Sequence, residues 1–559
     1  MNIDNDYIAD RFSLLAKLMD IHGENSFKTK SYSVAAFTLE KLPHPIADLP
    51  PEKFTSIKGI GDAIGKKIQQ ILHTGELPLL QEYIAKTPPG IIEMLRIKGL
   101  GPKKIATIWK EMEVESIGEL LYACQENRLL LYKGFGAKTQ QSVLETIEFF
   151  LKSQGSHLYA EIEPLAHSVE SLLQENFKNE KLTITGDFRR QLEIIDQLQW
   201  VTTITPDSLR TFFEEKGYTT AIPTENSPAP SHFKGPEGVD LSFLHTTPET
   251  FAATLLTTSC SGEFLEAWPS PIASHDSEEA IFSAAGIHFI PPFRREQRDI
   301  LEAAAAGPLP DPIQTSDIRA IIHSHSDWSD GSNTLEEMAK ACIKKGYEYL
   351  VISDHSKSAF YANGLKEDRI LEQHKLIDEL NRQLAPFTIF KSIECDILND
   401  GALDYSPDIL STFDLVITSV HSNLKMSEEK AMLRLLGAIH NPYTTILGHM
   451  TGRLLLSRPG YPVDHKKIIE ACAENNVAIE LNAHPRRLDM DWRWIGYALG
   501  KGVRISIDPD AHSTEGYEHV KYGVLAAQKA GVTAAQNLSS FTLAQFREFL
   551  AERKKVKGI

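Results

Sequence analysis

Two hydrophobic patterns divide the chain into a helical N-terminal part and a C-terminal part in which strands and helices alternate. In residues 5–42, apolar side chains such as Ile8, Phe12 and Leu15 recur at the spacing of amphipathic helices. From residue 318 onward, short β-branched apolar runs alternate with helical stretches. This alternation predicts about seven β/α units around a parallel sheet, with helices at 334–345, 366–384, 427–438, 464–475, 490–500 and 516–530.

Polar residues follow the apolar runs of the C-terminal part. Two of them, His323 and His325, stand two positions apart after a predicted strand at 318–322, so we expect both imidazoles on one face. Because β/α barrels carry their chemistry at the carboxyl ends of the strands, the whole set indicates a metal site; chance placement of ordinary polar residues is the alternative. The nine candidate ligands are His323, His325, Asp330, His355, Glu394, His421, His449, Asp510 and His512.

Three short turns in the helical part share one pattern: a lysine, a glycine, an apolar residue and a second glycine, at 57–61, 97–101 and 132–136. The glycines permit a tight turn with positive φ, which leaves backbone N–H groups at the start of the next helix free to hold a phosphate. The pattern resembles the helix–hairpin–helix motif, which binds the DNA backbone without reading bases; an ordinary helical corner closed by glycine is the alternative. The resemblance implies DNA contacts by Lys58, Gly59, Gly61, Lys66, Lys98, Gly99, Gly101, Lys103, Lys104, Lys133, Gly134 and Gly136.

Composition narrows the class of protein. The chain has 559 residues, enough for about three to four domains, and its five scattered cysteines favour a reducing cytosol over a disulfide framework. No apolar run reaches the ~18 residues of a membrane span, and no basic, apolar leader opens the sequence, so we expect a cytoplasmic protein without membrane contact. The net charge is −17, but residues 1–150 carry 18 Lys+Arg against 19 Asp+Glu, which leaves DNA binding through a local basic patch open.

The stretch at 182–200 resembles the palm of bacterial PolX enzymes, which are family X DNA polymerases. It contains Gly-Asp-Phe-Arg-Arg where the family has Gly-Ser-x-Arg-Arg. Two strand-borne aspartates of the family hold magnesium ions, but Gln197 and Gln199 occupy those positions here, and neutral amides are poor ligands for Mg²⁺. Asp240 matches the third carboxylate, and a shifted alignment would bring in Asp196. We therefore expect a nucleotidyltransferase-like α/β palm remnant without polymerase activity.

The same resemblance gives roles to three basic residues. Arg189 and Arg190 of the palm stretch are expected to contact DNA phosphates. In family X polymerases a lysine at the position of Lys67 forms a Schiff base with a 5′-deoxyribose phosphate, so the resemblance implies the same role for Lys67. Such a lysine needs a lowered pKa to act as a nucleophile; a solvated or phosphate-contacting lysine is the alternative.

The C-terminal part resembles the PHP (polymerase and histidinol phosphatase) family. The nine candidate ligands match the family's ligand places one by one, and words such as Ser329-Asp330-Gly331 match as well. The resemblance implies a distorted (β/α)7 barrel with two to three divalent ions, and this ligand set suits Mn²⁺, Zn²⁺ or Fe²⁺. One ion is assigned to His323, His325, Glu394 and Asp510, with Glu394 as the bridge to a second, and the remaining five residues complete the other sites.

Several neighbours of these ligands are candidates for catalysis. Arg453, Lys357 and Arg487 are expected to hold the non-reacting phosphate oxygens, each with a plain surface charge as the alternative. Asp354, beside His355, is expected to orient that imidazole. The predicted catalytic residues are therefore Arg453, Lys357, Asp354 and Lys67.

The resemblance to bacterial PolX covers nearly the whole chain and implies a multidomain α plus α/β protein in five parts. They are an N-terminal helical, lyase-like domain with the first hairpin at 1–85, a further helix–hairpin–helix region at 86–150, the degenerate palm and thumb at 151–292, a linker at 293–316, and the PHP phosphoesterase domain at 317–559.

The expected function is a metal-dependent DNA phosphoesterase in DNA repair. It would act as a 3′–5′ exonuclease, a 3′-end processing enzyme or an abasic-site endonuclease on gapped, nicked or damaged duplex. A small-molecule phosphatase of the histidinol-phosphatase type would share the barrel but has no use for three DNA-binding hairpins. A still active gap-filling polymerase is opposed by Gln197 and Gln199, and a non-catalytic DNA-binding scaffold would need a broken metal set.

Overall fold

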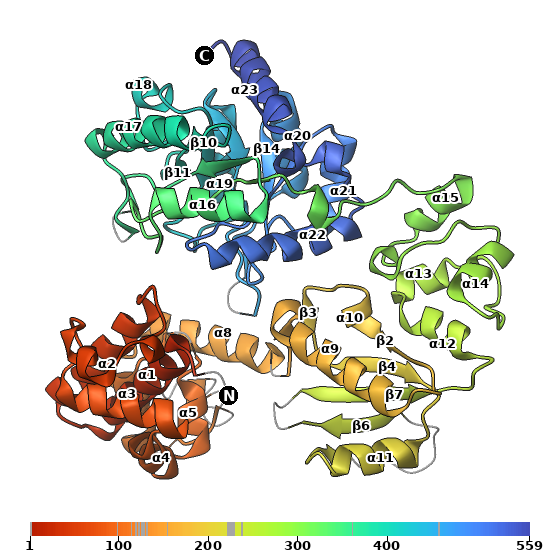
Figure 1. The fold of residues 1–559 in the computed structure, drawn as a ribbon, viewed down its shortest axis with the longest axis horizontal. Coiled ribbons are helices and arrows are strands. Elements are labelled where there is room, and N and C mark those ends of the chain that lie inside the picture. The colour runs from red at the N-terminus through yellow and green to blue at the C-terminus, as the bar shows by residue number, and fades with distance from the viewer. Residues whose placement is uncertain are drawn as a thin grey trace. The chain divides into compact units, whose positions relative to one another are not determined.

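The chain forms two compact units, Met1–Gln154 and Gly155–Ile559, whose elements are labelled in Figure 1. The computed structural model describes residues 3–97, 99–112, 114–117, 120, 123–124, 129, 132–153, 155–220, 230–235, 239–359, 362–456 and 459–559. Among these residues, none of the helices combines the length and apolar character needed to cross a membrane.

The described part of the first unit is helical. The two amphipathic helices predicted within 5–42 are confirmed as α1 and α2, which pack against each other. Ile8, Phe12 and Leu15 of α1 are fully buried, as their spacing predicts. The elements are α1 (Asn5–His22), α2 (Ser26–Glu40), η1 (Ile46–Asp48), η2 (Pro51–Ser56), α3 (Asp62–Thr74), α4 (Pro78–Ala85), α5 (Pro89–Met94), α6 (Pro102–Lys110) and α8 (Ala137–Ser153).

All three glycine turns have the predicted left-handed backbone. The first glycine of each turn has a φ of +97°, +90° or +96°, at Gly59, Gly99 and Gly134 respectively. The second glycine of the first two turns, Gly61 or Gly101, is the N-cap of α3 or α6, and no side chain caps either helix. Each helix therefore begins with backbone N–H groups that its own side chains leave open, as a phosphate-binding turn requires. The apolar residues between the glycines are buried: Ile60, Leu100 and Phe135.

The second unit begins with a mixed sheet in the order β2-β4-β7-β6-β5. β4 and β7 are parallel, and the other neighbours are antiparallel. Its core is aromatic, with Trp200, Phe213 and Phe243 buried between the sheet and its helices. The elements are β1 (His157–Leu158), α9 (Tyr159–Asn176), β2 (Leu182–Thr185), α10 (Gly186–Arg189), β3 (Ile194–Ile195), β4 (Leu198–Thr202), α11 (Pro206–Glu214), β5 (Thr219–Thr220), β6 (Ser231–Lys234) and β7 (Asp240–His245).

Short helices with a small core of their own follow this sheet. They are α12 (Phe251–Thr258), α13 (Gly262–Glu266), α14 (Glu278–Ala284), η4 (Pro292–Arg294) and α15 (Asp299–Ala306). The predicted linker at 293–316 begins inside this body, because Arg295 is fully buried and Leu301 and Ala304 belong to the core. Only the stretch after Ala306 is an extended connection, which shortens the linker that the proline and alanine pattern predicts.

In the described residues of the C-terminal part, eight short parallel strands form two sheets, ordered β10-β9-β8 and β11-β12-β13-β14-β15. Isolated parallel bridges join the sheets at their carboxyl ends, between Ser324 and Ala511 and between His355 and Glu394. The strands are β8 (Ala320–Ile321), β9 (Tyr349–Ile352), β10 (Thr388–Lys391), β11 (Glu394–Asp396), β12 (Val416–Ser419), β13 (Thr444–Leu447), β14 (Ala478–Asn482) and β15 (Ile505–Asp508).

All six helices predicted for this part are present. The last begins later than predicted, because Glu515–His519 forms the 3-10 turn η7 before α22. Alternate strand residues build two apolar layers: Ile321 and Leu350 face the surrounding helices, whereas Tyr349 and Val351 pack with α23. The helices are α16 (Leu335–Lys345), α17 (Glu367–Gln383), α18 (Pro407–Leu410), α19 (Glu428–His440), α20 (His465–Asn475), α21 (Trp492–Gly500), α22 (Val520–Lys529) and α23 (Leu543–Lys557).

Candidate functional site

Two of the predicted ligands are brought together by a turn and not by strand alternation. β8 ends at Ile321, and His323 has a φ of +60°, so the chain turns before His325. Asp510 also lies in the left-handed region, with a φ of +51°, a conformation that costs on the order of 1 kcal/mol or more for a residue with a side chain. The His325 N–H donates to the Ala511 carbonyl at 2.8 Å, which ties the two strained turns together.

A first group of four side chains surrounds one point at the carboxyl ends of the strands. The Nε2 of His323 lies 3.3 Å from Glu394 Oε1 and 3.5 Å from Asp510 Oδ1. The Nε2 of His325 lies 3.0 Å from the same Asp510 oxygen. One ligand atom from each residue falls within 4.8 Å of the others, and all four residues are at most 8% exposed. This is the set that the family resemblance assigns to a single ion.

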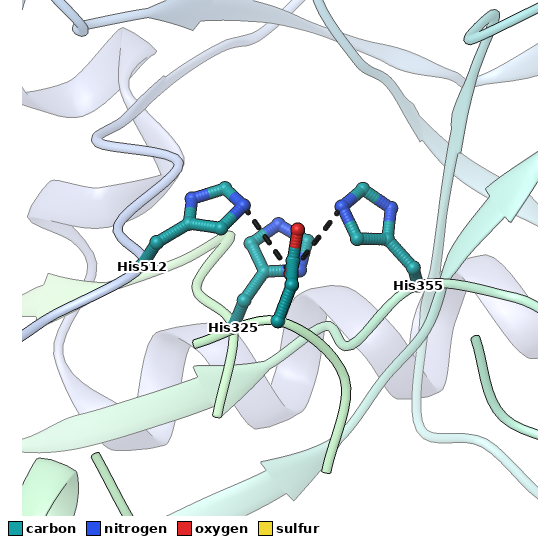
Figure 2. Close-up of side chains that lie close together, drawn as sticks. His325, His355 and His512 are labelled. Carbon is teal, nitrogen blue, oxygen red and sulfur yellow. Dashed lines mark ion pairs between the residues drawn. The ribbon is translucent and has the colours of Figure 1, made fainter. Parts of the chain in front are cut away.

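A second group shares His325 with the first and adds Asp330, His355 and His512. The Nε2 atoms of His355 and His512 lie 3.7 Å and 3.5 Å from Asp330 Oδ1, and Figure 2 shows these two rings on either side of a carboxylate close to His325. The ring of His325 stacks against both others, with centroids 4.3 Å apart in each case. The arrangement brings three imidazoles and a carboxylate to one place.

A third group shares Glu394 with the first group and His355 with the second. It contains His355, Glu394 and His421, with His421 Nε2 3.1 Å from Glu394 Oε1. His449 Nε2 lies 3.0 Å from the same oxygen. Glu394 therefore touches all three groups, and the structure gathers all nine predicted ligands in one continuous cluster.

Carboxylates behind the cluster orient its imidazoles. Glu480 of β14 is fully buried and lies 2.5 Å from His323 Nδ1, and Asp396 of β11 lies 2.9 Å from His421 Nδ1. A partner on the second ring nitrogen fixes which nitrogen faces a metal. No local sequence pattern predicts this role for either residue; the signal available is that both are acidic residues in apolar stretches that lead to the site.

The donor set fits divalent metal ions. The buried Nε2 of His323 faces two carboxylates at 3.3 and 3.5 Å but makes no hydrogen bond to the residues described. Oε2 of Glu394 is likewise buried without a hydrogen bond among them. Lone pairs that converge in this way favour a cation between them, and the mixture of imidazole and carboxylate suits borderline divalent metals.

Opposed effects set the protonation of the cluster. Burial and two neighbouring imidazoles lower the pKa of His325 to about 3, so its ring is neutral near pH 7. Burial disfavours charge on Glu394, but the surrounding imidazoles outweigh it and hold the pKa of this carboxyl well below its usual range. Burial also opposes a charged His421, yet Glu394 and Asp396 raise the pKa of His421 to about 10. Protons on such imidazoles compete with metal for the same nitrogen atoms.

Asp354 does not orient His355, contrary to the prediction. Its carboxylate is fully buried and accepts hydrogen bonds from the backbone and hydroxyl of Ser326 at 2.8 and 2.7 Å, and from the hydroxyl of Ser329 at 2.6 Å. Gln373 of α17 adds a fourth bond at 2.6 Å. Asp354 thus anchors the loop that carries Asp330, which is a structural role one step away from the ligands.

The three cations predicted to hold phosphate differ in their surroundings. Lys357 forms an ion pair with Glu367 at 2.6 Å. Arg453 forms one with Asp491 at 2.6 Å and donates from Nε to the Arg487 carbonyl at 2.9 Å. Of the three, Arg487 is the one that contacts the ligand cluster, since its Nε lies 3.7 Å from Asp510 Oδ2. The half-buried Arg453 therefore supports the loop of Arg487, and Lys357 is held by its ion pair with Glu367.

The predicted DNA-binding residues of the first unit lie at the hairpin turns. Lys58, Lys66, Lys103 and Lys133 are exposed beside their turns. Lys104 is partly buried and donates from Nζ to the Gly99 carbonyl at 3.3 Å. Lys98 lies outside the described residues. The exposed glycines complete the three turns: Gly59, Gly61, Gly99, Gly101, Gly134 and Gly136.

Lys67 lines a cavity beside the first hairpin, with a volume of about 850 Å³. Lys28, Lys30 and Tyr32 of α2 line the same cavity. Lys67 is partly buried on α3. A cavity lined by three lysines suits an anionic ligand, which agrees with the interpretation of this region as a DNA-binding surface.

The two arginines of the palm stretch are engaged inside the protein. Arg189 forms a two-bond pair with Glu278 at 2.6 and 3.0 Å and also donates to Ser259 at 2.8 Å. Arg190 pairs with Glu296 at 3.0 Å and with Asp187 at 2.5 Å. These partners occupy the guanidinium groups that were expected to contact DNA phosphates. The prediction missed them because Glu278 and Glu296 are 89 and 106 residues away in the chain.

Comparison with known proteins defines the class first. Three protein-family models match the chain: a helix-hairpin-helix domain over residues 3–77, a SAM-like helix-hairpin-helix tandem over 91–148, and a PHP domain over 322–484. The chain therefore joins DNA-binding helical modules to a PHP domain, which implies divalent-metal binding.

The family follows from a relative that matches almost from end to end. The DNA polymerase/3′-5′ exonuclease PolX of Bacillus subtilis (strain 168) is 31% identical over 558 residues, which cover 96% of this chain and 97% of the relative. The chain belongs to the PolX family, so it is expected to be an enzyme that acts on DNA. Two shorter relatives match only the C-terminal part. A probable phosphatase of Thermoanaerobacter sp. (strain X514) is 26% identical over 253 residues, 42% of this chain and 96% of the relative. One of Caldanaerobacter subterraneus subsp. tengcongensis is 30% identical over 207 residues, 34% of this chain and 74% of the relative.

Proposed function

We propose that this protein is a metal-dependent DNA phosphoesterase that trims or opens DNA ends during repair and has lost the polymerase activity of its family. The observation that carries the proposal is the continuous nine-residue cluster around Glu394, in a chain whose N-terminal unit matches helix-hairpin-helix models. The activities that fit are 3′–5′ exonuclease, 3′-end processing and abasic-site cleavage. A phosphatase that acts on small molecules would need the C-terminal part alone.

The fold proposed for the catalytic part is a distorted (β/α)7 barrel. Two residues separate β10 from β11, so these short strands count as two halves of one strand and give seven in all. The parallel bridges from Ser324 to Ala511 and from His355 to Glu394 support closure where the ligands lie. A closed arrangement accounts for ligands from the first and last strands meeting at one point.

Two to three divalent ions, such as Mn²⁺, Zn²⁺ or Fe²⁺, would be held by the three ligand groups. When bound, they supply Lewis acidity for hydrolysis of a phosphoester. The protein's own contribution is to fix the ligands: Glu480 orients His323, Asp396 orients His421, and burial keeps the imidazole of His325 neutral. These contacts reduce the reorganisation needed when an ion and a phosphate enter.

Arg487 is proposed to hold the phosphate oxygens that do not react. Its guanidinium is next to the ligand Asp510, and its side chain is 21% exposed, so one side remains open to a substrate. The backbone around it is fixed, because the Arg487 N–H donates to the His484 carbonyl at 2.7 Å and Arg453 binds the Arg487 carbonyl. Planar guanidinium groups suit two-point binding of phosphate.

Loss of polymerase activity is supported by the middle sheet. Gln199 lies on β4 over the Gly186 turn, so close that a Cβ at Gly186 would be 2.2 Å from Gln199 Oε1. Asp196, the alternative ligand, precedes β4 and accepts a bond from Ser156 at 2.6 Å. Asp240 is left as the only acidic member of the three aligned positions, and two ions need more than one carboxylate.

The position of Lys67 favours a second activity, removal of a 5′-deoxyribose phosphate through a Schiff base. The cavity beside Lys67 contains two further lysines, Lys28 and Lys30, whose charge suits a sugar phosphate. Borohydride trapping on a DNA strand with that end would give a covalent product in the native chain and none in Lys67→Ala. Trapping that persists in the variant would remove Lys67 from this role.

The phosphoesterase is tested by comparing a DNA end with a small phosphate ester. A 5′-labelled strand that ends at a gap in a duplex is incubated with Mn²⁺ and the native chain, His323→Ala/His325→Ala, or the matched control His440→Ala at an exposed position on α19. We expect shortening by the native chain and the control but not by the double variant. Rapid hydrolysis of p-nitrophenyl phosphate with intact DNA would favour the small-molecule phosphatase instead.

A further inference from the structure

A cavity of the second unit lies between the loops that follow β11 and β12. Its volume is about 490 Å³, within the roughly 300–1,000 Å³ of sites for small ligands. None of the residues that line it is acidic, and three of them are basic. The lining consists of Asn399, Asn423, Lys425, Met426, Ser427, Lys430 and Arg434.

This cavity adjoins the metal ligands. Asn423 is two residues beyond the ligand His421, so their Cα atoms lie within about 7 Å of each other, because an extended chain spans at most about 3.6 Å per residue. Asn399 is three residues beyond Asp396, which contacts His421 Nδ1 at 2.9 Å. The two loops meet where Asn423 Nδ2 donates to Asn399 Oδ1 at 3.0 Å.

A fully buried arginine of α19 joins the two loops. Arg434 donates from Nε to the Leu398 carbonyl at 3.0 Å and from Nη1 to the Ser422 carbonyl at 2.8 Å. Its Nη2 donates to the Ile397 carbonyl. One side chain thus fixes both loops from within the protein, and the cavity keeps its shape without a ligand.

The hydrogen bonds of Arg434 go to neutral groups. Besides the carbonyl oxygens, Nη1 contacts the sulfur of Met426 at 3.9 Å. Burial lowers the pKa of Arg434, and Tyr461 and Asp396 offset this effect only in part. Because a buried charge is stable only with compensation, an anion in the cavity would lie in a favourable field.

Two lysines add positive charge to the cavity. Lys425 and Lys430 line it and are exposed to solvent. The acidic Asp400 is in the same loop as Asn399, but it accepts the Ala402 N–H at 3.0 Å and does not line the cavity. Lysine, amide and hydroxyl donors together suit the oxygens of a phosphate in a nucleic acid backbone.

We propose that this cavity binds the backbone phosphate next to the one that is hydrolysed, and thereby makes the metal centre specific for a DNA strand over a phosphate monoester. The proposal rests on the proposed function and names a specificity site for it. A stacked strand rises about 3.4 Å per nucleotide, so a cavity that begins within about 7 Å of a ligand is one or two nucleotides from the reacting phosphate. A small ester has no second phosphate and cannot use this site.

The test compares two substrates of the full chain in Mn²⁺: a 5′-labelled strand that ends at a gap, and p-nitrophenyl phosphate. Each lysine–phosphate contact adds about 0.7 to the salt dependence of single-strand binding, so Lys425→Gln or Lys430→Gln should lower kcat/KM for DNA about 5-fold at about 0.1 M salt, and the double variant about 25-fold. The plot of log kcat/KM against log salt should become shallower by about 0.7 for each lysine removed. Hydrolysis of p-nitrophenyl phosphate should be unchanged.

Two controls separate a local phosphate contact from a general effect of charge. Lys375→Gln, at an exposed position on α17, should change neither substrate nor the salt dependence. Lys425→Arg/Lys430→Arg keeps the charge and should restore activity on DNA and the native salt dependence.

The outcomes distinguish this proposal from the proposed function. Native chain that shortens DNA together with glutamine variants of native rate and native salt dependence would overturn this proposal alone. Equal losses on DNA and p-nitrophenyl phosphate would also overturn it, because the lysines would then support the metal centre and not the strand. A native chain that hydrolyses p-nitrophenyl phosphate but leaves DNA intact would refute the proposed function, and this proposal with it.

Discussion

Two buried carboxylates of the second unit, Glu394 in the C-terminal part and Glu278 beside the middle sheet, have opposite surroundings. Glu394 is encircled by five imidazoles at 3.0–3.6 Å, whose charge, unlike that of a guanidinium group, depends on their protonation. Glu278 is bound by the guanidinium groups of Arg189 and Arg295 at 2.6 and 2.5 Å. Both carboxyls are nearly inaccessible to solvent, with side-chain exposures of 1% and 7%. The first lacks a permanent counter-charge and the second has two.

Glu394 therefore lies in a site that can still bind a cation, whereas the charge of Glu278 is already neutralised by arginine side chains. Permanent cations neutralise Glu278, and the same pairs occupy an arginine that the palm pattern of the family places at phosphate. The cluster around Glu394 instead offers convergent imidazole nitrogen and carboxylate oxygen atoms, and imidazoles can lose their protons to bind metal. Buried charge is stable only when paired or bound to metal, so the kind of partner indicates whether a buried acid is structural or available for chemistry.

The largest effect is expected from Glu394→Gln. The amide removes the charge that two of the three ligand groups share, so we expect Mn²⁺-dependent DNA shortening to fall by more than about 100-fold, beyond the loss typical for a residue behind the ligands. Metal binding by calorimetry should weaken in parallel. Glu428→Gln, at an exposed position at the start of α19, is the matched control. Native activity in Glu394→Gln would contradict the bridging role.

Glu278→Gln should affect stability and leave the metal centre alone. Two buried arginines would lose their shared anion, which costs about 3 kcal/mol, and urea unfolding of the second unit should shift accordingly. Burial alone would raise the pKa of Glu278, but Arg189 and Arg295 lower it below its usual value. The Glu278 carboxylate therefore adds to the free energy of unfolding above about pH 4.5, and this contribution is lost as the pH falls through its lowered pKa.

Two comparisons check this assignment of Glu278. The neighbouring Glu279→Gln, at an exposed position, should leave both stability and its dependence on pH unchanged. On acidification, Glu278→Gln should lose less stability than the native chain, because the variant lacks the carboxylate that titrates. Loss of DNA shortening in a folded Glu278→Gln protein would show that the middle sheet takes part in the chemistry after all.

A smaller effect is expected from Glu480→Gln. Glu480 touches His323 Nδ1 and accepts the His449 N–H at 3.0 Å, so it orients two ligands without being one. Substitution of a residue that orients metal ligands lowers metal affinity about 10- to 100-fold. The rate of DNA shortening by the variant should recover in part at saturating Mn²⁺. Glu474→Gln, exposed on α20, serves as the control. Unchanged affinity would mean that the 2.5 Å contact has no orienting function.

The smallest expected effect is a release of protons when metal binds. Carboxylates raise the pKa of His421 to about 10 and that of His512 to about 9, against the opposing effect of burial. Both imidazoles are therefore protonated near pH 7 in the absence of metal and must lose protons to bind it, so metal affinity should rise with pH. Calorimetry in two buffers of different ionisation enthalpy should give different heats; equal heats would contradict this assignment.

Much of the metal centre could be predicted because its signals are local. Each ligand follows an apolar run and is of a type that binds metal. Residues such as His421 and His449 can therefore be recognised from the short stretch of sequence around each of them. The positions of α16, α17 and α19 to α22 follow from helical periodicity in the same way. Long-range pairing left no such trace: the contact of Glu480 with His323 spans 157 residues.

Backbone geometry and packing account for the other differences. The convergence of His323 and His325 depends on a left-handed turn that a strand pattern does not show. Asp354 is adjacent to His355 in sequence, but its carboxylate points to the loop of Ser326 and Ser329. The alanine-rich stretch before residue 307 has the composition of a linker, yet its Leu301 is buried in the core of the short helices.

The most direct test of the central claim follows one 5′-labelled strand that ends at a five-nucleotide gap, in Mn²⁺ with all four deoxynucleoside triphosphates present. Lengths are resolved on a denaturing gel for the native chain and for Glu394→Gln. The account predicts shorter products from the native chain, a strand of unchanged length with the variant, and extension by neither. Extended strands that persist in Glu394→Gln would show that the middle sheet still polymerises, and would contradict the claim that the C-terminal metal centre alone carries the chemistry at 3′ ends of DNA.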